Sequence, residues 1–171
     1  MKMNVTMPDD DDPVVNDVGL AGLPRLNLPC FEFEVRGGGE RRHIFDPIRQ
    51  QYVRLSPEEW VRQHFLRYLT LYCAYPASLI AVEKGFQYQN MARRADIVVH
   101  DRKAKPFLMV ECKAPAVSIS QAAFDQISRY NRVVGARYLV VTNGWTHFCW
   151  KVEDKLGTYS FMDSPPAYEE A

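Results

Sequence analysis

The sequence is missing the features that mark several classes of protein. Its apolar runs are shorter than the roughly 18 uncharged residues that a membrane-spanning helix needs, and the start MKMNVTMPDDDD has neither the basic nor the apolar segment of a secretory signal. Its four cysteines are spaced about forty residues apart without a CxxC pair, which disfavours a zinc site or a disulfide framework. We therefore expect a cytoplasmic protein with reduced thiols and no membrane association.

The chain also has little net charge. Its 21 Lys and Arg balance 21 Asp and Glu over 171 residues, which disfavours a protein that coats nucleic acid by bulk electrostatic attraction. The balance is uneven, because the first 17 residues hold five aspartates against Lys2, whereas the rest has 20 positive and 16 negative side chains. We expect a flexible acidic tail over residues 1–26 ahead of a mildly basic domain.

With 47% hydrophobic residues, the size and composition suit one domain with an ordinary core. We place it over residues 27–163, with a flexible C-terminus over 164–171. It begins with an expected hairpin at about 31–46, where apolar and acidic residues alternate before Gly37-Gly38-Gly39. The core of the domain is expected over about 56–151.

A helix is predicted to begin after Ser56. Ser56 is a favoured cap residue, Pro57 suits the first helical position, and Glu59 occupies the capping-box position. An apolar stripe at helical spacing follows, made of Val61, Phe65, Tyr68, Leu69 and Tyr72. At about 100° per residue, Glu58 falls near the centre of this stripe and Glu59 far from it. We therefore expect Glu58 to point into the protein and Glu59 out.

The rest of the chain predicts an α/β domain. Short runs of β-forming residues occupy 79–82, 97–99, 107–110, 138–141 and 148–150, and a second amphipathic helix is expected over 118–134, closed by Gly135. The resulting order of elements, αβββαββ, is typical of a mixed sheet flanked by helices.

Three charged residues lie on strands that should be buried. The linker between the second and third strands has hairpin length, so we expect Ile97 to pair with Val110 and Asp96 to lie across from Glu111. Lys113 lies two residues beyond Glu111 and returns to the same face. The sequence therefore predicts that the three charged groups converge.

Two facing carboxylates repel each other, and their burial is tolerable when a cation lies between them. The carboxylates of Asp96 and Glu111, the backbone carbonyl of Cys112 and several waters would suit Mg²⁺, with Mn²⁺ as an alternative. Lys113 would then contact a water or a phosphate oxygen, an arrangement that serves phosphodiester hydrolysis. The other interpretation is that Glu111 and Lys113 form a plain ion pair and that nothing binds.

Three segments in order carry a resemblance to a known family. RADIVV at 94–99, VECKAP at 110–115 and QISRY at 126–130 resemble the PD-(D/E)xK nuclease superfamily in its RecB-like form with a QxxxY motif. The resemblance is to the N-terminal nuclease domain of type I restriction enzyme R subunits, including small stand-alone versions, and covers about 45–163. It implies a restriction-endonuclease-like αβββαβ core. The proline of the PD half is absent here, because Ala95 precedes Asp96.

By this resemblance Asp96 and Glu111 are metal ligands and Lys113 is the catalytic lysine. The family also has a helical glutamate in an E-x-x-x-R arrangement, which Glu58 and Arg62 match, so Glu58 joins the catalytic candidates.

The resemblance further implies that Gln126 and Tyr130 lie near DNA phosphates. They are four residues apart and therefore share a helix face, although Tyr130 also belongs to an apolar stripe. We add Arg94 as a candidate phosphate contact.

Two functions follow from these residues. The first is a magnesium-dependent deoxyribonuclease, an endonuclease related to restriction and defence enzymes. The second is a catalytically idle nucleic-acid-binding or assembly module that docks on a separate motor or specificity subunit. The chain has no GxxxxGK[ST] phosphate loop, so we expect DNA translocation to need such a partner. Self-association as a homo-oligomer is left open.

Overall fold

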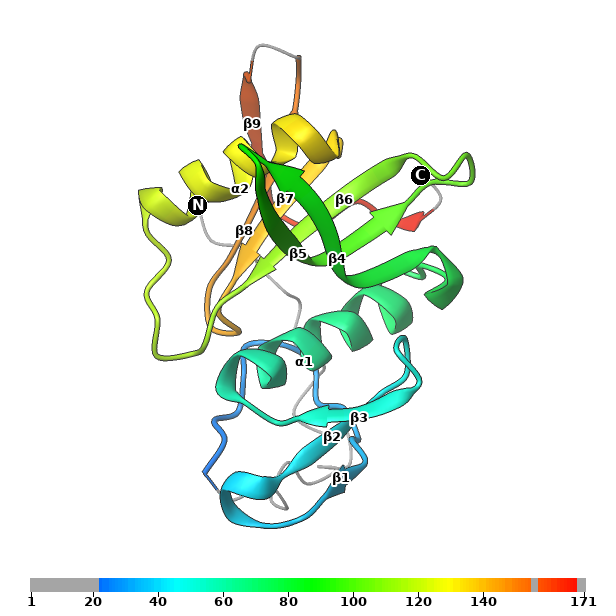
Figure 1. Ribbon diagram of the computed structural model, residues 1–171, viewed down its shortest axis with the longest axis vertical. Coiled ribbons are helices and arrows are strands. Elements are labelled where there is room, and N and C mark those ends of the chain that lie inside the picture. The colour runs from blue at the N-terminus through cyan, green and yellow to red at the C-terminus, as the bar shows by residue number, and fades with distance from the viewer. Residues whose placement is uncertain (1–21, 155–156, 169–171) are drawn as a thin grey trace.

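The computed structural model describes residues 22–154 and 157–168. Most of the expected acidic tail, residues 1–21, lies outside the described residues, as do residues 169–171 at the C-terminus. Figure 1 shows a small sheet of β1 to β3, then helix α1, then a larger sheet, with helix α2 beside the larger sheet. Helix α1 contacts strands β5 and β6, whereas α2 contacts β4, β6 and β7. The larger sheet therefore has a helix on each face.

The small sheet is an antiparallel meander. It contains β1 (Val35–Arg36), β2 (His43–Asp46) and β3 (Gln51–Arg54), in that order. A short 3₁₀ helix, Gly39–Arg41, lies between β1 and β2. An antiparallel hairpin lies within the expected 31–46 segment, with its first strand confined to Val35–Arg36, and β3 adds a strand that the sequence pattern did not predict.

The larger sheet has six strands in sequence order. They are β4 (Ile80–Tyr88), β5 (Met91–His100), β6 (Pro106–Cys112), β7 (Tyr138–Thr142), β8 (His147–Val152) and β9 (Tyr159–Met162), with a 3₁₀ turn at Ala77–Leu79 before β4. Strands β6 and β7 are parallel and the other pairs antiparallel. The predicted mixed sheet is confirmed, with β9 as an unpredicted edge strand.

Helix α1 begins, and helix α2 ends, where the sequence carries a local signal. Helix α1 spans Pro57–Leu71, and the Oγ of Ser56 accepts a hydrogen bond from the Glu59 amide at 3.0 Å. Helix α2 spans Gln121–Val134 and is closed by Gly135 in the left-handed region at φ 77°. The predicted cap and the predicted glycine terminator are both confirmed.

The six-stranded sheet is buried on both faces. Along β5, Ile97 and Val99 pack into the core beside α1, whereas Val98 packs into the core beside α2. All three residues are fully buried. This explains why the strands read as continuous apolar runs instead of alternating patterns.

Two segments expected in the termini lie against the domain. Leu26 is 3% exposed, and the Nε1 of Trp60 donates a hydrogen bond to the Pro24 carbonyl at 3.0 Å. At the other end, the Tyr168 amide donates to the Cys73 carbonyl at 2.9 Å. Residues 22–26 and 164–168 therefore cover the core, because apolar side chains and backbone groups there find partners on the domain.

All four cysteines are free thiols. In the described part of the chain, neither helix is both long enough and apolar enough to cross a membrane.

Candidate active site

The β5–β6 hairpin brings the first two candidate residues together. Ile97 pairs with Val110 as predicted, and the register continued by one residue sets Asp96 across from Glu111. The Oδ2 of Asp96 accepts a hydrogen bond from the Cys112 amide at 2.7 Å. Asp96 is therefore held against the residue that separates Glu111 from Lys113.

Glu111 is held by two donors. The Nζ of Lys113 donates to its Oε1 at 2.7 Å, and the Nε2 of Gln126 donates to the same oxygen at 2.9 Å. Glu111 is 7% exposed. The structure thus brings Lys113 and Gln126 to Glu111, from strand β6 and helix α2 respectively.

Burial and neighbouring charges shift the pKa values of three side chains at this site. Burial and the charge of Asp96 raise the pKa of Glu111, and the same two causes raise the pKa of Glu58. Burial opposes the charge of Lys113, but its hydrogen bond to Glu111 raises the pKa of the lysine. Lys113 therefore stays protonated, whereas burial and Asp96 oppose the ionisation of Glu58 and Glu111.

Arg62 of helix α1 forms ion pairs with carboxylates of two elements, α1 itself and strand β5. Its Nη2 donates to Asp96 Oδ1 at 2.7 Å and to Glu58 Oε1 at 3.2 Å, and its Nη1 pairs with Glu59. The Arg62 side chain is 6% exposed. Burial works against its charge, but Asp96 and Glu59 raise the pKa of Arg62 above its ordinary value. Arg62 entered the sequence analysis only through the E-x-x-x-R resemblance.

The burial predicted for the first two glutamates of α1 is the reverse of what the structure shows. Glu58 reaches Arg62 at the site, with its side chain 47% exposed. Glu59, expected to point outward, is only 5% exposed. The reason is that the β1–β3 sheet covers the side of α1 opposite the large sheet (Figure 1), so both sides of the helix are buried. A single apolar stripe could not show this.

Three further charged residues, Arg49, Asp46 and Glu83, contact this region, and no local sequence signal predicted it. Arg49 lies in the turn between β2 and β3, and it pairs with Asp46, Glu59 and Glu83. No periodicity or motif marks Arg49, because its partners come from three separate elements.

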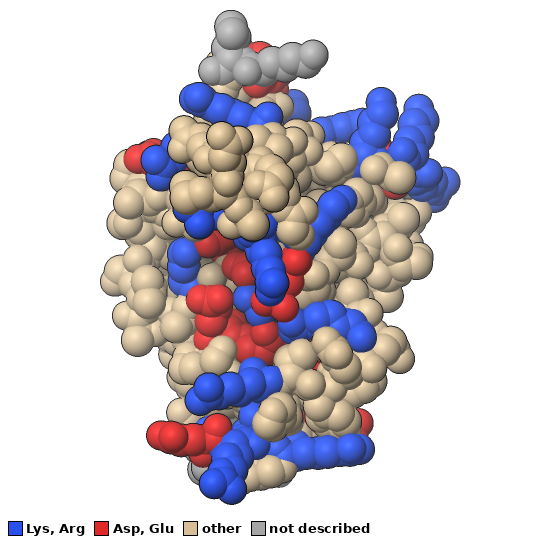
Figure 2. Space-filling model, in the orientation of Figure 1, with Lys and Arg blue, Asp and Glu red and all other residues tan. Residues whose placement is uncertain are grey.

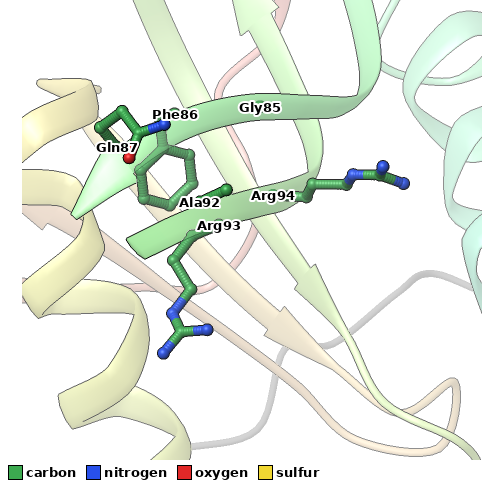
Figure 3. A pocket seen from close by; sticks show the side chains of 6 residues that line it. All are labelled: Gly85, Phe86, Gln87, Ala92, Arg93 and Arg94. Carbon is green, nitrogen blue, oxygen red and sulfur yellow. The ribbon is translucent and has the colours of Figure 1, made fainter. Parts of the chain in front are cut away.

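The residues expected near DNA phosphates are not gathered at one point. The ring of Tyr130 packs against Phe86 and Tyr88, with centroids 5.4 Å from each. Arg94 is exposed on β5 and lines, with Arg93, a surface hollow of about 640 Å³. Figure 3 shows the two guanidinium groups extending away from β5 in different directions. Tyr130 therefore supports the β4–β5 hairpin that carries Arg94.

The charge distribution has an acidic centre. Figure 2 shows Asp and Glu side chains gathered between α1 and the large sheet, with Lys and Arg side chains around them. Among the described residues, no three His, Cys, Asp or Glu side chains form a cluster already placed to hold a metal ion. Asp96 and Glu111 each contact a basic side chain instead.

Comparison with known proteins places the chain in a family. The model of the type I restriction enzyme R protein N terminus (HSDR_N) matches residues 57–166. Among solved structures, a fragment of a putative HsdR subunit of a type I restriction enzyme from Vibrio vulnificus YJ016 is 21% identical, with a TM-score of 0.40 over 53% of this chain and 19% of that chain. This chain thus covers about a fifth of that protein. A search of curated proteins gave no match. Because the family match spans more than half of the chain and includes every candidate site residue, the chain belongs to the family of type I restriction enzyme R protein N-termini.

Proposed function

We propose that this domain is a metal-dependent endonuclease that hydrolyses DNA phosphodiester bonds in a restriction or defence system. The observation that carries the proposal is the placement of Asp96 and Glu111 on neighbouring strands, with Lys113 2.7 Å from Glu111. The element order α1–β4–β5–β6–α2–β7 around a mixed sheet supports a restriction-endonuclease-like core. Family membership supports the restriction context.

The donor groups suit a hard divalent cation. Asp96, Glu111 and the backbone carbonyl of Cys112 would hold Mg²⁺ or Mn²⁺, because these ions prefer carboxylate and carbonyl oxygens. Burial and the charge of Asp96 raise the pKa values of Glu58 and Glu111, and a bound cation would favour the ionised form of both side chains. When bound, such an ion supplies Lewis-acid stabilisation of charge on the phosphoryl group.

The chain's own side chains have separable roles in this proposal. Lys113 remains protonated and donates to a phosphate oxygen on which charge develops. Gln126 and Lys113 together hold Glu111 in one orientation. Glu58 is half-exposed with a raised pKa, which suits it to orient a water and to accept its proton.

Substrate contacts would come from the rim of the site. Arg94 is exposed on β5, two residues before Asp96, and would pair with a DNA phosphate. Tyr130 would act on the same contact by supporting Phe86 and Tyr88, since β4 carries both residues and pairs with β5.

The test is cleavage of closed circular and linear DNA in Mg²⁺, Mn²⁺ or EDTA. We expect the wild-type protein to cut the closed circle with either metal ion and not in EDTA. Lys113→Ala should lower the rate about 100-fold or more, whereas Lys103→Ala, an exposed lysine in the β5–β6 turn, should not. Uncut circles in both metals, or an undiminished rate for folded Lys113→Ala, would overturn the proposal.

One observation favours a second function, that of a catalytically idle module. Asp96 and Glu111 are each paired with a basic side chain, Arg62 and Lys113, so the charges have partners within the chain. Such a module would bind DNA, or a separate motor or specificity subunit, without cutting. The same experiment separates the two functions when a DNA-binding measurement is added: binding that is equal in EDTA and Mg²⁺, without cleavage, supports the idle module.

A further inference from the structure

A network of buried ion pairs begins at Arg49 and runs towards the site. Arg49 uses three nitrogens on three carboxylates. Its Nε lies 2.6 Å from Asp46 Oδ2, its Nη2 lies 2.5 Å from Glu59 Oε1, and its Nη1 lies 2.7 Å from Glu83 Oε2. The Arg49 side chain is 14% exposed. One planar guanidinium thus joins the small sheet, helix α1 and strand β4.

The network continues from Glu59 to Asp96. Glu59 accepts from Arg49 through Oε1 and from Arg62 through Oε2. Arg62 in turn donates to Asp96 Oδ1 at 2.7 Å. Gln63 closes the network from the side, because its Nε2 donates to Asp46 at 2.8 Å and to Glu59 at 2.9 Å. Every link from the β2–β3 turn to Asp96 is a direct contact.

Burial makes this network stiff. Glu59 and Arg62 are each 5% exposed, so water cannot readily replace a lost partner, and each group stays where its partners are. Arg62 is therefore held by Glu59 at one nitrogen while its other nitrogen orients Asp96. If Glu59 moves, the nitrogen that fixes Asp96 moves with it.

A second route reaches Asp96 through strand β4. The pairs Val82–Ile97 and Lys84–Ala95 place Glu83 opposite Asp96. Glu83 has a positive φ of 50°, a conformation that is strained for a non-glycine residue. Its pairing with Arg49 holds this strained residue in place, directly beside the backbone that carries Asp96.

We propose that Arg49 is a positioning residue for the Asp96 carboxylate, acting through Glu59 and Arg62 and through Glu83. The small β1–β3 sheet is thereby part of the active site. This inference rests on the proposed function for the role of Asp96. The family match begins at residue 57, so it assigns no role to Arg49.

The test uses Arg49→Lys, which keeps the positive charge and loses the planar fork. The Cys112 amide donates to Asp96 Oδ2, so hydrogen exchange at this amide reports the position of Asp96 without metal or DNA. We expect its protection to fall about 10-fold more than that of the Ala136 amide, which bonds to Asn131 at the C-terminal end of α2. General destabilisation would lower both alike.

Two further readouts use the metal and the substrate. Arg49→Lys should weaken Mn²⁺ binding by calorimetry about 10-fold and lower kcat while leaving the KM for DNA near the wild-type value. The matched control is Arg54→Lys, an exposed arginine on the same small sheet, which should match the wild type in all three measurements.

The outcomes separate this inference from the proposed function. If the wild type neither binds Mn²⁺ nor cuts DNA, the proposed function fails, and the Cys112 amide still decides the role of Arg49. If the wild type is active and Arg49→Lys keeps normal Cys112 protection and Mn²⁺ affinity, the positioning role is overturned. Should Arg49→Lys fail to fold, Glu59→Gln and Glu83→Gln replace it, one for each route, and an unchanged Cys112 amide in both variants also overturns the role.

Discussion

The two carboxylates of the site differ in how they are held. Asp96 pairs with Arg62 and accepts a hydrogen bond from the Cys112 amide, so its negative charge stabilises the folded protein. Glu111 is more costly to ionise, because burial and the nearby Asp96 raise its pKa. Neutralising one residue or the other should therefore change stability in opposite directions.

In EDTA at pH 7.5, we expect Glu111→Gln to raise the melting temperature and Asp96→Asn to lower it. Because the pKa of Glu111 is raised on folding, its ionisation weakens the fold as pH rises above the unfolded value of about 4.3. The gain of Glu111→Gln should therefore vanish at pH 4. Asp96→Asn leaves Arg62 short of a charged partner and should cost about 1 to 3 kcal/mol. Thermal melts of both variants at the two pH values measure this, and shifts of the same sign at pH 7.5 would contradict it.

At the scale of elements, helix α1 shows what the spacing of apolar residues can predict and what it cannot. The cap at Ser56 correctly predicts where the helix begins, and four of the five stripe residues are buried, whereas Tyr72 is 54% exposed. The stripe also led to the wrong expectation that Glu59 is exposed. Because α1 lies between two sheets, polar residues are also buried on the side that faces the small sheet. The burial of Glu59 becomes evident only from its ion pairs with Arg49 and Arg62.

This geometry predicts different defects for the two neighbouring glutamates. Glu58→Gln should strongly lower Mg²⁺-dependent cleavage with little change in melting temperature, because the side chain is half-exposed beside the site. Glu59→Gln should lower stability by about 2 kcal/mol or more, because it removes a buried charge shared by two arginines. Turnover at saturating metal and circular dichroism melts give both quantities. A stable Glu59→Gln variant would show that the buried pairs contribute little.

At the scale of the whole molecule, the domain is larger than its family match. The match begins at residue 57, yet Ile44 of β2 is fully buried in the same core as Trp60 and Phe65 of α1. The small sheet therefore covers apolar surface that the rest of the domain cannot bury by itself.

We expect a chain that begins at residue 56 not to form a native core. Without the small sheet, Trp60 loses its cover and Arg62 and Glu59 lose Arg49, so a large apolar and charged surface meets water. Near-ultraviolet circular dichroism should lose its aromatic signal, and the dye ANS should bind, whereas the chain beginning at residue 22 should show neither change. A cooperative melt of the shorter chain would contradict this expectation.

Local interactions in the chain account for the order of elements, the β5–β6 register, and the placement of Asp96, Glu111 and Lys113, since caps, turns and strand alternation act between near neighbours. The resemblance implied that Gln126 lies near DNA phosphates, whereas the structure shows its amide bonded to Glu111. Other features depend on contacts between residues from 10 to 34 positions apart. These are the burial of Glu59, the ion pair of Arg62 with Asp96, and the ion pairs of Arg49 with Glu59 and Glu83. Such contacts arise only when the small sheet, α1 and the large sheet pack together, and a buried charge takes whichever partner that packing supplies.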